Sequence, residues 1–115
     1  MRRIAAAYPS LFTSDSGCFH DCPEGWEPLV MELCGRLVAE HPDVRCMQCK
    51  SKFGVLRVCL DDGASEAAVA LKREYEARSS GMCQECGSPG GAVHGRYGWV
   101  STLCPEHATE NLPAA

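Results

Sequence analysis

The chain has 115 residues and a hydrophobic content of 45%, which suits a single domain over 1–115 with a modest core. Its formal net charge of −4 argues against a generic nucleic-acid binder, because phosphate neutralisation by Lys and Arg supplies most nonspecific affinity. Nine cysteines without a signal peptide or a long apolar run predict thiols in a reducing cytoplasm and no membrane association.

The N-terminal part of the chain predicts one helix after a long loop. Residues 1–10 are expected to be a loosely held terminus, and residues 8–25, rich in Ser, Asp, Gly and Pro, an ordered loop. Apolar residues then recur at spacings of three and four, which predicts a helix that ends near Glu40, before His41-Pro42. The members of this stripe are Trp26, Leu29, Val30, Leu33, Cys34, Leu37 and Val38.

The middle of the chain predicts a strand followed by a second helix. Leu56, Val58 and Leu60 alternate with Val55, Arg57 and Cys59, while Gly54 marks a bulge or turn. Asp62 is expected to cap a helix that ends at 78–81. Its predicted inner face comprises Ala64, Ala67, Ala68, Leu71 and Tyr75. We therefore expect a small α+β domain with two helices and a short sheet.

The C-terminal third carries four residues at the spacing of metal ligands. Cys83 and Cys86 are separated by two residues, and so are Cys104 and His107. Zinc prefers four such donors in a tetrahedron, and a full set of four predicts one structural ion rather than a catalytic one. Pro105 predicts a short helix that holds His107. We expect a zinc-ribbon or treble-clef-like hairpin in a zinc-binding subdomain over 81–112; buried free cysteines and a surface histidine are the alternative.

A second pair, Cys46 and Cys49, has the same spacing and leaves two interpretations open. In the first, the pair recruits Cys18, His20, Cys22 or Cys34 to a second metal site. No second clean pair completes such a set, so buried thiols are the favoured interpretation. Cys34 and Cys59 are likewise expected to be small core residues.

Three segments carry a resemblance to a family of small, mostly uncharacterised proteins encoded by bacteriophages and prophages. They are 22–26 (CPEGW), 48–57 (QCKSKFGVLR), and the C-terminal residues Ser80, 83–87 (CQECG), Gly98-Trp99 and 103–107 (LCPEH). The resemblance implies the four metal ligands and a Lys-x-Lys-Phe-Gly-x-Leu-Arg motif, in which Ser51 and Val55 occupy the two x positions here. It implies no enzymatic activity. Cys46 and Cys49 depart from the family, which has apolar residues there.

Three classes of function are open. The favoured one is a non-enzymatic protein in the cytoplasm of a bacterial host that binds a host or phage protein and inhibits a nucleic-acid-processing or defence complex, in the manner of an anti-CRISPR protein. The second is a nucleic-acid-binding accessory that uses the basic segment 45–57. Candidate contacts for either partner are Lys50, Lys52, Phe53 and Arg57; the alternative for the lysines is a solvated strand edge. The third class, a His-Asn-His-type nuclease, rests on His94 alone.

Overall fold

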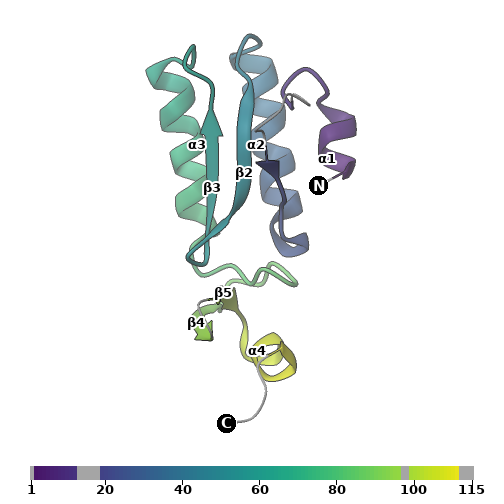
Figure 1. Cartoon of the computed structure of the whole chain (residues 1–115), viewed down its shortest axis with the longest axis vertical. Helices are drawn as coiled ribbons and strands as arrows, with labels where there is room; N and C mark the ends of the chain where they lie inside the picture. Colours follow the sequence, from purple (N-terminus) through teal and green to yellow (C-terminus); the bar gives the residue numbers. More distant parts are fainter. Residues whose placement is uncertain (1, 13–18, 97–98, 112–115) are drawn as a thin grey trace.

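The structure is a computed structural model of the whole chain, and it describes residues 2–12, 19–96 and 99–111 (Figure 1). The architecture is α+β, as predicted, but the described residues form four α-helices and two small sheets where two helices and one sheet were expected. The molecule measures 48 × 27 × 23 Å. The larger sheet and its helices occupy one end, and the predicted metal hairpin occupies the other.

The predicted first long helix is confirmed as α2 (Glu27–Glu40), which follows a short 3-10 helix over Glu24–Trp26. The helix ends where proline was expected to stop it, since His41 adopts an extended φ of −140°. The apolar stripe faces the core, with Trp26, Leu29, Val30, Leu33, Cys34 and Leu37 buried and Val38 packed against them.

The N-terminal residues 1–10 differ from the loosely held terminus that the sequence predicts. Residues Arg2–Ala7 form the helix α1, which packs on α2. Ile4 is completely buried, and Arg3 donates a hydrogen bond of 2.8 Å to Glu27. A six-residue helix has little intrinsic stability, so burial of Ile4 supplies the free energy that orders it.

The larger sheet has the strand order β1-β2-β3, from β1 (Phe19–His20), β2 (Cys46–Lys52) and β3 (Val55–Leu60). β1 runs parallel to β2, and β2 forms an antiparallel hairpin with β3. The two turn residues, Phe53 and Gly54, have φ values of +54° and +82°, as a type I′ turn requires. Leu56 and Val58 are buried, which confirms the alternation predicted for this strand.

The second long helix, α3 (Glu66–Ser79), begins later than predicted. Its cap is Ser65, whose Oγ accepts a hydrogen bond of 3.2 Å from the amide of Ala68, and not Asp62. Leu71 and Tyr75 are buried as expected, whereas Ala67 is exposed. Figure 1 shows α2 and α3 side by side on one face of the sheet, which leaves the opposite face of β2 and β3 uncovered by helices.

Side chains of α3 also bind the outer strand of the sheet. The amide of Leu56 donates a hydrogen bond of 2.9 Å to Ser79 Oγ, and the amide of Val58 donates one of 2.8 Å to Glu76 Oε2. Ser79 is completely buried, and its hydroxyl donates a hydrogen bond of 2.6 Å to the carbonyl of Glu76. Two amides of β3 are therefore satisfied by a helix and not by a fourth strand.

The C-terminal unit follows the predicted order of turn, hairpin and helix. Its elements are β4 (Ala92–Arg96), β5 (Trp99–Leu103) and α4 (Pro105–Asn111). Cys83, Leu103 and Cys104 form a small buried cluster of their own, separate from the main core between sheet and helices. In the described part of the chain, no helix is long and apolar enough to cross a lipid bilayer.

Candidate metal centre

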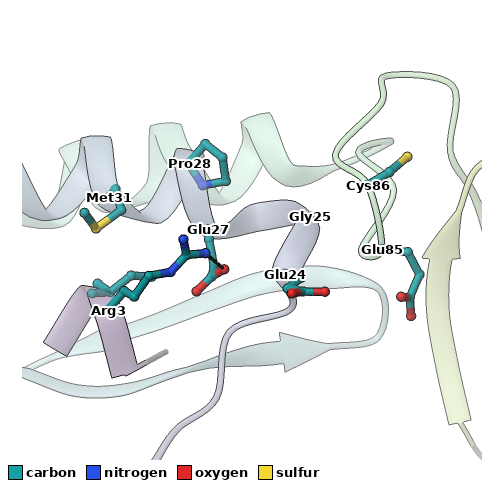
Figure 2. Close-up of a pocket in the computed structure, with 9 residues that line it drawn as sticks. Arg3, Glu24, Gly25, Glu27, Pro28, Met31, Glu85 and Cys86 are labelled. Atoms are coloured by element: carbon teal, nitrogen blue, oxygen red, sulfur yellow. Dashed lines mark hydrogen bonds and ion pairs between the residues drawn. The ribbon is translucent and has the colours of Figure 1, made fainter. Parts of the chain in front are cut away.

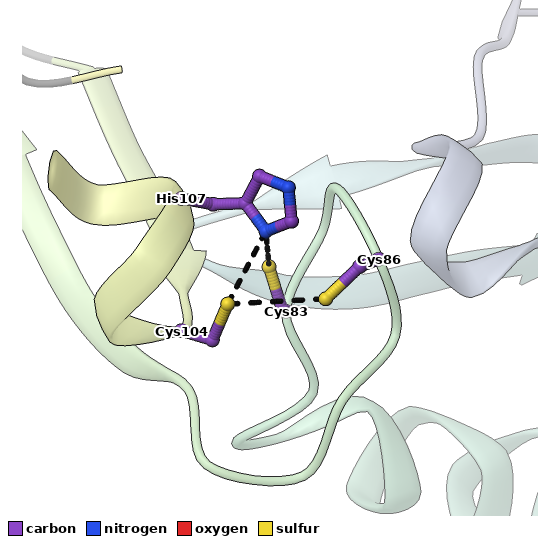
Figure 3. Close-up of side chains that lie close together, drawn as sticks. All are labelled: Cys83, Cys86, Cys104 and His107. Atoms are coloured by element: carbon purple, nitrogen blue, oxygen red, sulfur yellow. Dashed lines mark hydrogen bonds between the residues drawn. The ribbon is translucent and has the colours of Figure 1, made fainter. Parts of the chain in front are cut away.

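The structure brings all four predicted metal ligands together at the junction of the C-terminal hairpin and α4. One donor atom each from Cys83, Cys86, Cys104 and His107 lies within 4.8 Å of every other (Figure 3). The sulfur of Cys83 lies 3.6 Å from His107 Nδ1, and the sulfurs of Cys86 and Cys104 are 3.8 Å apart. These four donors are close enough to hold a metal ion.

The chain reaches this geometry through two turns and a helix start. Gly81 and Gly87, on either side of the first cysteine pair, have φ values of +81° and +80°, in the left-handed region that glycine tolerates best. The amide of Gly87 donates to the carbonyl of Cys83 at 2.8 Å and closes the first turn. Pro105 begins α4 directly after Cys104, and the first turn of this helix turns His107 back toward the sulfurs.

The local electrostatics favour thiolates at this site. Backbone and side-chain hydrogen bonds from His107 lower the pKa of Cys104 to about 6. Burial by itself raises the pKa of Cys83, but backbone amides of Cys104, Cys86 and Glu85 outweigh it, so the net shift is downward. Because metals bind the thiolate and not the thiol, both shifts prepare the site for a cation.

The turn that carries Cys83 and Cys86, here called the metal turn, is hydrogen-bonded to the segment that precedes α2. The amide of Gly25 donates a hydrogen bond of 2.8 Å to the carbonyl of Gln84, and Trp26 Nε1 donates one of 3.0 Å to the carbonyl of Met82. A Cβ on Gly25 would lie 2.3 Å from the carbonyl oxygen of Cys83, so only glycine fits. The segment 22–26 of the phage-family resemblance thus packs directly on the metal turn.

Among the described residues, the second cysteine pair is not part of a metal-binding group. A β-bulge between Cys46 and Gln48 turns both Cys46 and Cys49 into the core, although Cys49 is three positions after Cys46 and a regular strand would place them on opposite faces. A hydrogen bond with Cys49, followed by burial, raises the pKa of Cys22. Burial also raises the pKa of Cys34, to about 12. Burial and a raised pKa are properties of core thiols. Cys18 and the His20 side chain, the other predicted ligands of a second site, lie outside the described residues.

The predicted partner-binding residues share the open face of the larger sheet. Lys50 lies directly opposite Arg57 in the hairpin, and Lys52 lies two residues further along β2. Cys59, which was expected in the core, is exposed on this face and donates to Gln48 Oε1 at 3.9 Å. Phe53 is 72% exposed at the tip. The sequence indicated the shared face of the two lysines, and the strand register adds Arg57 to it.

The cations on the open sheet face differ from those on the helices in their ion pairing. Arg36, Lys72 and Arg78 each form an ion pair with a glutamate at 2.7–3.1 Å. In the part of the chain that the structure describes, no ion pair includes Lys50, Lys52 or Arg57.

The nuclease hypothesis gains no second catalytic group from the geometry. His94 lies half-buried in β4, opposite Ser101 of β5. Within the described residues, it belongs to no cluster of three or more His, Cys, Asp or Glu side chains. The Trp99 side chain lies outside the described residues.

A cavity of about 390 Å³ lies between α1, the 3-10 helix and the metal turn (Figure 2). Its wall includes the ion pair of Arg3 with Glu27, and this arginine lowers the pKa of the Glu27 carboxyl. Glu24, Glu85 and Cys86 at the wall are exposed to solvent. The cavity is an acidic surface depression beside one of the metal ligands.

Comparisons of the chain with family models, with curated proteins and with solved structures find no match. The geometry defines a small α+β protein with a candidate Cys₃His metal centre at one end and an uncovered basic sheet face.

Proposed function

We propose that the ion held by Cys83, Cys86, Cys104 and His107 is a single structural zinc. In a tetrahedron with zinc–sulfur bonds of about 2.3 Å and zinc–nitrogen bonds of about 2.0–2.1 Å, neighbouring donors are about 3.6–3.8 Å apart. Two of the three closest separations, at 3.6 Å and 3.8 Å, fit this figure, and the third, 3.2 Å between Cys104 Sγ and His107 Nδ1, is shorter. Four protein donors leave no open position for substrate, which supports a structural and not a catalytic ion.

We further propose that the protein acts without catalysis, by forming a stoichiometric complex with a host or phage protein and blocking a nucleic-acid-processing or defence complex. The observation that carries this proposal is the open sheet face. It combines three cations without ion-pair partners in the described part of the chain and an aromatic side chain that is 72% exposed. Aromatic side chains and arginine, represented here by Phe53 and Arg57, are enriched at protein interfaces.

The test is affinity purification of the tagged protein from a phage-infected bacterial host, followed by native mass spectrometry. The expected result is one zinc and one partner protein at a fixed ratio. The double variant Lys50→Glu with Lys52→Glu should lose the partner and keep the melting temperature. Arg73→Glu, an exposed charge reversal on α3, is the matched control and should keep the partner. A partner retained by the double variant would exclude this face as the binding site.

A second candidate function, binding of single-stranded nucleic acid, is favoured by the arrangement of the same cations. Lys50 and Arg57 are directly opposed, and Lys50 also lines a groove of about 350 Å³ between β2 and β5. Three phosphate contacts predict that the logarithm of affinity falls with the logarithm of salt concentration with a slope of about −2. Titration of oligothymidine at several salt concentrations tests this, and a flat salt dependence would rule it out.

A further inference from the structure

The two large hydrophobic side chains that are most exposed in the described part of the chain come from different units and lie at one place. Phe53, at the tip of the β2–β3 hairpin, is 72% exposed, and Val93, in β4 of the metal hairpin, is 62% exposed. A Cβ on Gly54 would lie 3.6 Å from Val93 Cγ2, so this valine packs beside the turn that carries Phe53. We call the turn with Phe53 and the adjacent Val93 the apolar tip, and Lys52 Nζ lies 5.8 Å from the centre of the Phe53 ring.

One buried hydrogen bond joins the two halves of this apolar tip. Thr102 Oγ1 donates to the carbonyl of Gly54 at 2.6 Å. Thr102 lies directly opposite Val93 in the β4–β5 ladder, so both side chains face the turn. Thr102 is only 1% exposed, which shields the bond from competing water.

The position of Thr102 is in turn set by the metal turn. The amide of Gln84 donates to the carbonyl of Thr102 at 2.9 Å, and the amide of Thr102 donates to Gln84 Oε1 at 2.8 Å. Gln84 lies between the ligands Cys83 and Cys86. The same residue therefore holds Thr102 through both its backbone and its side chain, and its own conformation is fixed by the metal-binding turn.

We infer that the bound metal assembles a docking surface for a protein partner, through the contacts from Gln84 to Thr102 and from Thr102 to Gly54. The surface consists of Phe53 and Val93 together with the cations of the adjoining strands, which are Lys50 and Lys52 on β2 and Arg57 on β3. Its occupant is a protein segment that offers an apolar side chain flanked by carboxylates, because an apolar tip with unpaired cations beside it is complementary to that chemistry. This inference rests on the proposed function, and it adds that Val93 is held beside the Phe53 turn, and the surface is complete, only in the metal-loaded protein.

The assembly step is tested without any partner, by NMR and amide hydrogen exchange of the zinc-loaded protein, the chelated protein and two variants. Chelation should shift the amide resonances of Phe53, Gly54 and Val55 and speed exchange in the turn about fivefold to tenfold, the scale of one hydrogen bond. Thr102→Val removes the hydroxyl but keeps the shape. It should reproduce the chelated behaviour of the turn while the protein still holds one zinc. Ser101→Ala, the neighbouring hydroxyl, should change neither. An unaltered turn after chelation or in Thr102→Val would overturn the inference.

The occupant is tested by titrating the zinc-loaded protein with an acetylated peptide that has two leucines between glutamates, and separately with oligothymidine. The peptide should shift resonances of both Phe53 and Val93, and chelation should abolish this effect. Shifts caused only by oligothymidine, and confined to Lys50, Arg57 and Phe53, would assign the surface to nucleic acid and overturn the protein occupant. Because the assembly step is measured without a partner, its failure is distinct from a failure of the proposed complex.

Discussion

Gly25 and Gly87, which are far apart in the sequence, lie in direct backbone contact. A Cβ on Gly25 would lie 2.6 Å from the amide nitrogen of Gly87, and a Cβ on Gly87 would lie 2.6 Å from the carbonyl oxygen of Gly25. Both neighbours are backbone atoms, which cannot move aside as a flexible side chain can. The contact joins the 3-10 helix that precedes α2 to the metal turn and makes glycine necessary on both sides.

Gly25→Ala should therefore destabilise the protein strongly. The added methyl group has to displace backbone, and overpacking of this kind costs about 1–3 kcal/mol. For a chain of this size, we expect the melting temperature to fall by about 5–20 °C. Gly90→Ala is the matched control, since a Cβ there meets no atom within 4 Å. Thermal unfolding followed by circular dichroism measures both, and equal melting temperatures would contradict the packing argument.

Ser79→Ala should destabilise the main core by about 1–3 kcal/mol. The substitution removes the acceptor of the Leu56 amide and leaves that buried donor without a partner. Ser80→Ala changes the next residue, which is exposed, and should alter the free energy of unfolding by less than about 0.5 kcal/mol. Urea unfolding gives both values. If the two variants were equally stable, the hydrogen bond to β3 would contribute nothing measurable.

Cys104→Ala should abolish metal binding and unfold the region from about Gly81 to Asn111. The main core includes α3 residues such as Leu71 and Tyr75, so α2, β2, β3 and α3 should stay folded. Metal content by mass spectrometry and hydrogen exchange along the chain report the two effects. Cys59→Ala, at an exposed thiol outside the site, should change neither.

Acidification should release the metal. The pKa of Cys104 is lowered from 9.0 to about 6, so the stabilisation that its thiolate contributes is fully present above pH 9 and is lost as the pH falls through about 6. Hydrogen bonding to Cys104 raises the pKa of His107, so a proton competes with the metal for this ligand as well. Competition with a chromophoric chelator should show metal affinity falling steeply between about pH 7 and pH 5. An affinity that stays constant over this range would contradict the assignment of these ligands.

The sequence predicted those parts of the protein that depend on local pattern. The apolar stripe of α2 and its end before Pro42 follow from spacing and from a proline restriction, and both agree with the structure. The grouping of the four candidate ligands follows from their spacing in the same way. Neither prediction needed any contact between distant parts of the chain.

The missed features depend on tertiary contacts. Helix α1 is too short to be recognised by periodicity. It forms because its own residue Ile4 is buried in the core. The residue that caps α3 is Ser65 and not Asp62, although both side chains suit a cap. Thr102 and Val93 have no sequence pattern that connects them to Phe53, because the hairpin turn and the metal unit meet only in the folded protein.

The hydrogen bonds from β3 to Ser79 and Glu76 restrict how the protein can associate. An outer strand normally offers a row of free amides on which another chain can add a strand. Here the amides of Leu56 and Val58 are already bound to α3. Along β3, these two amides are therefore not available to a partner peptide or a second copy, which makes addition of a strand at this edge less favourable.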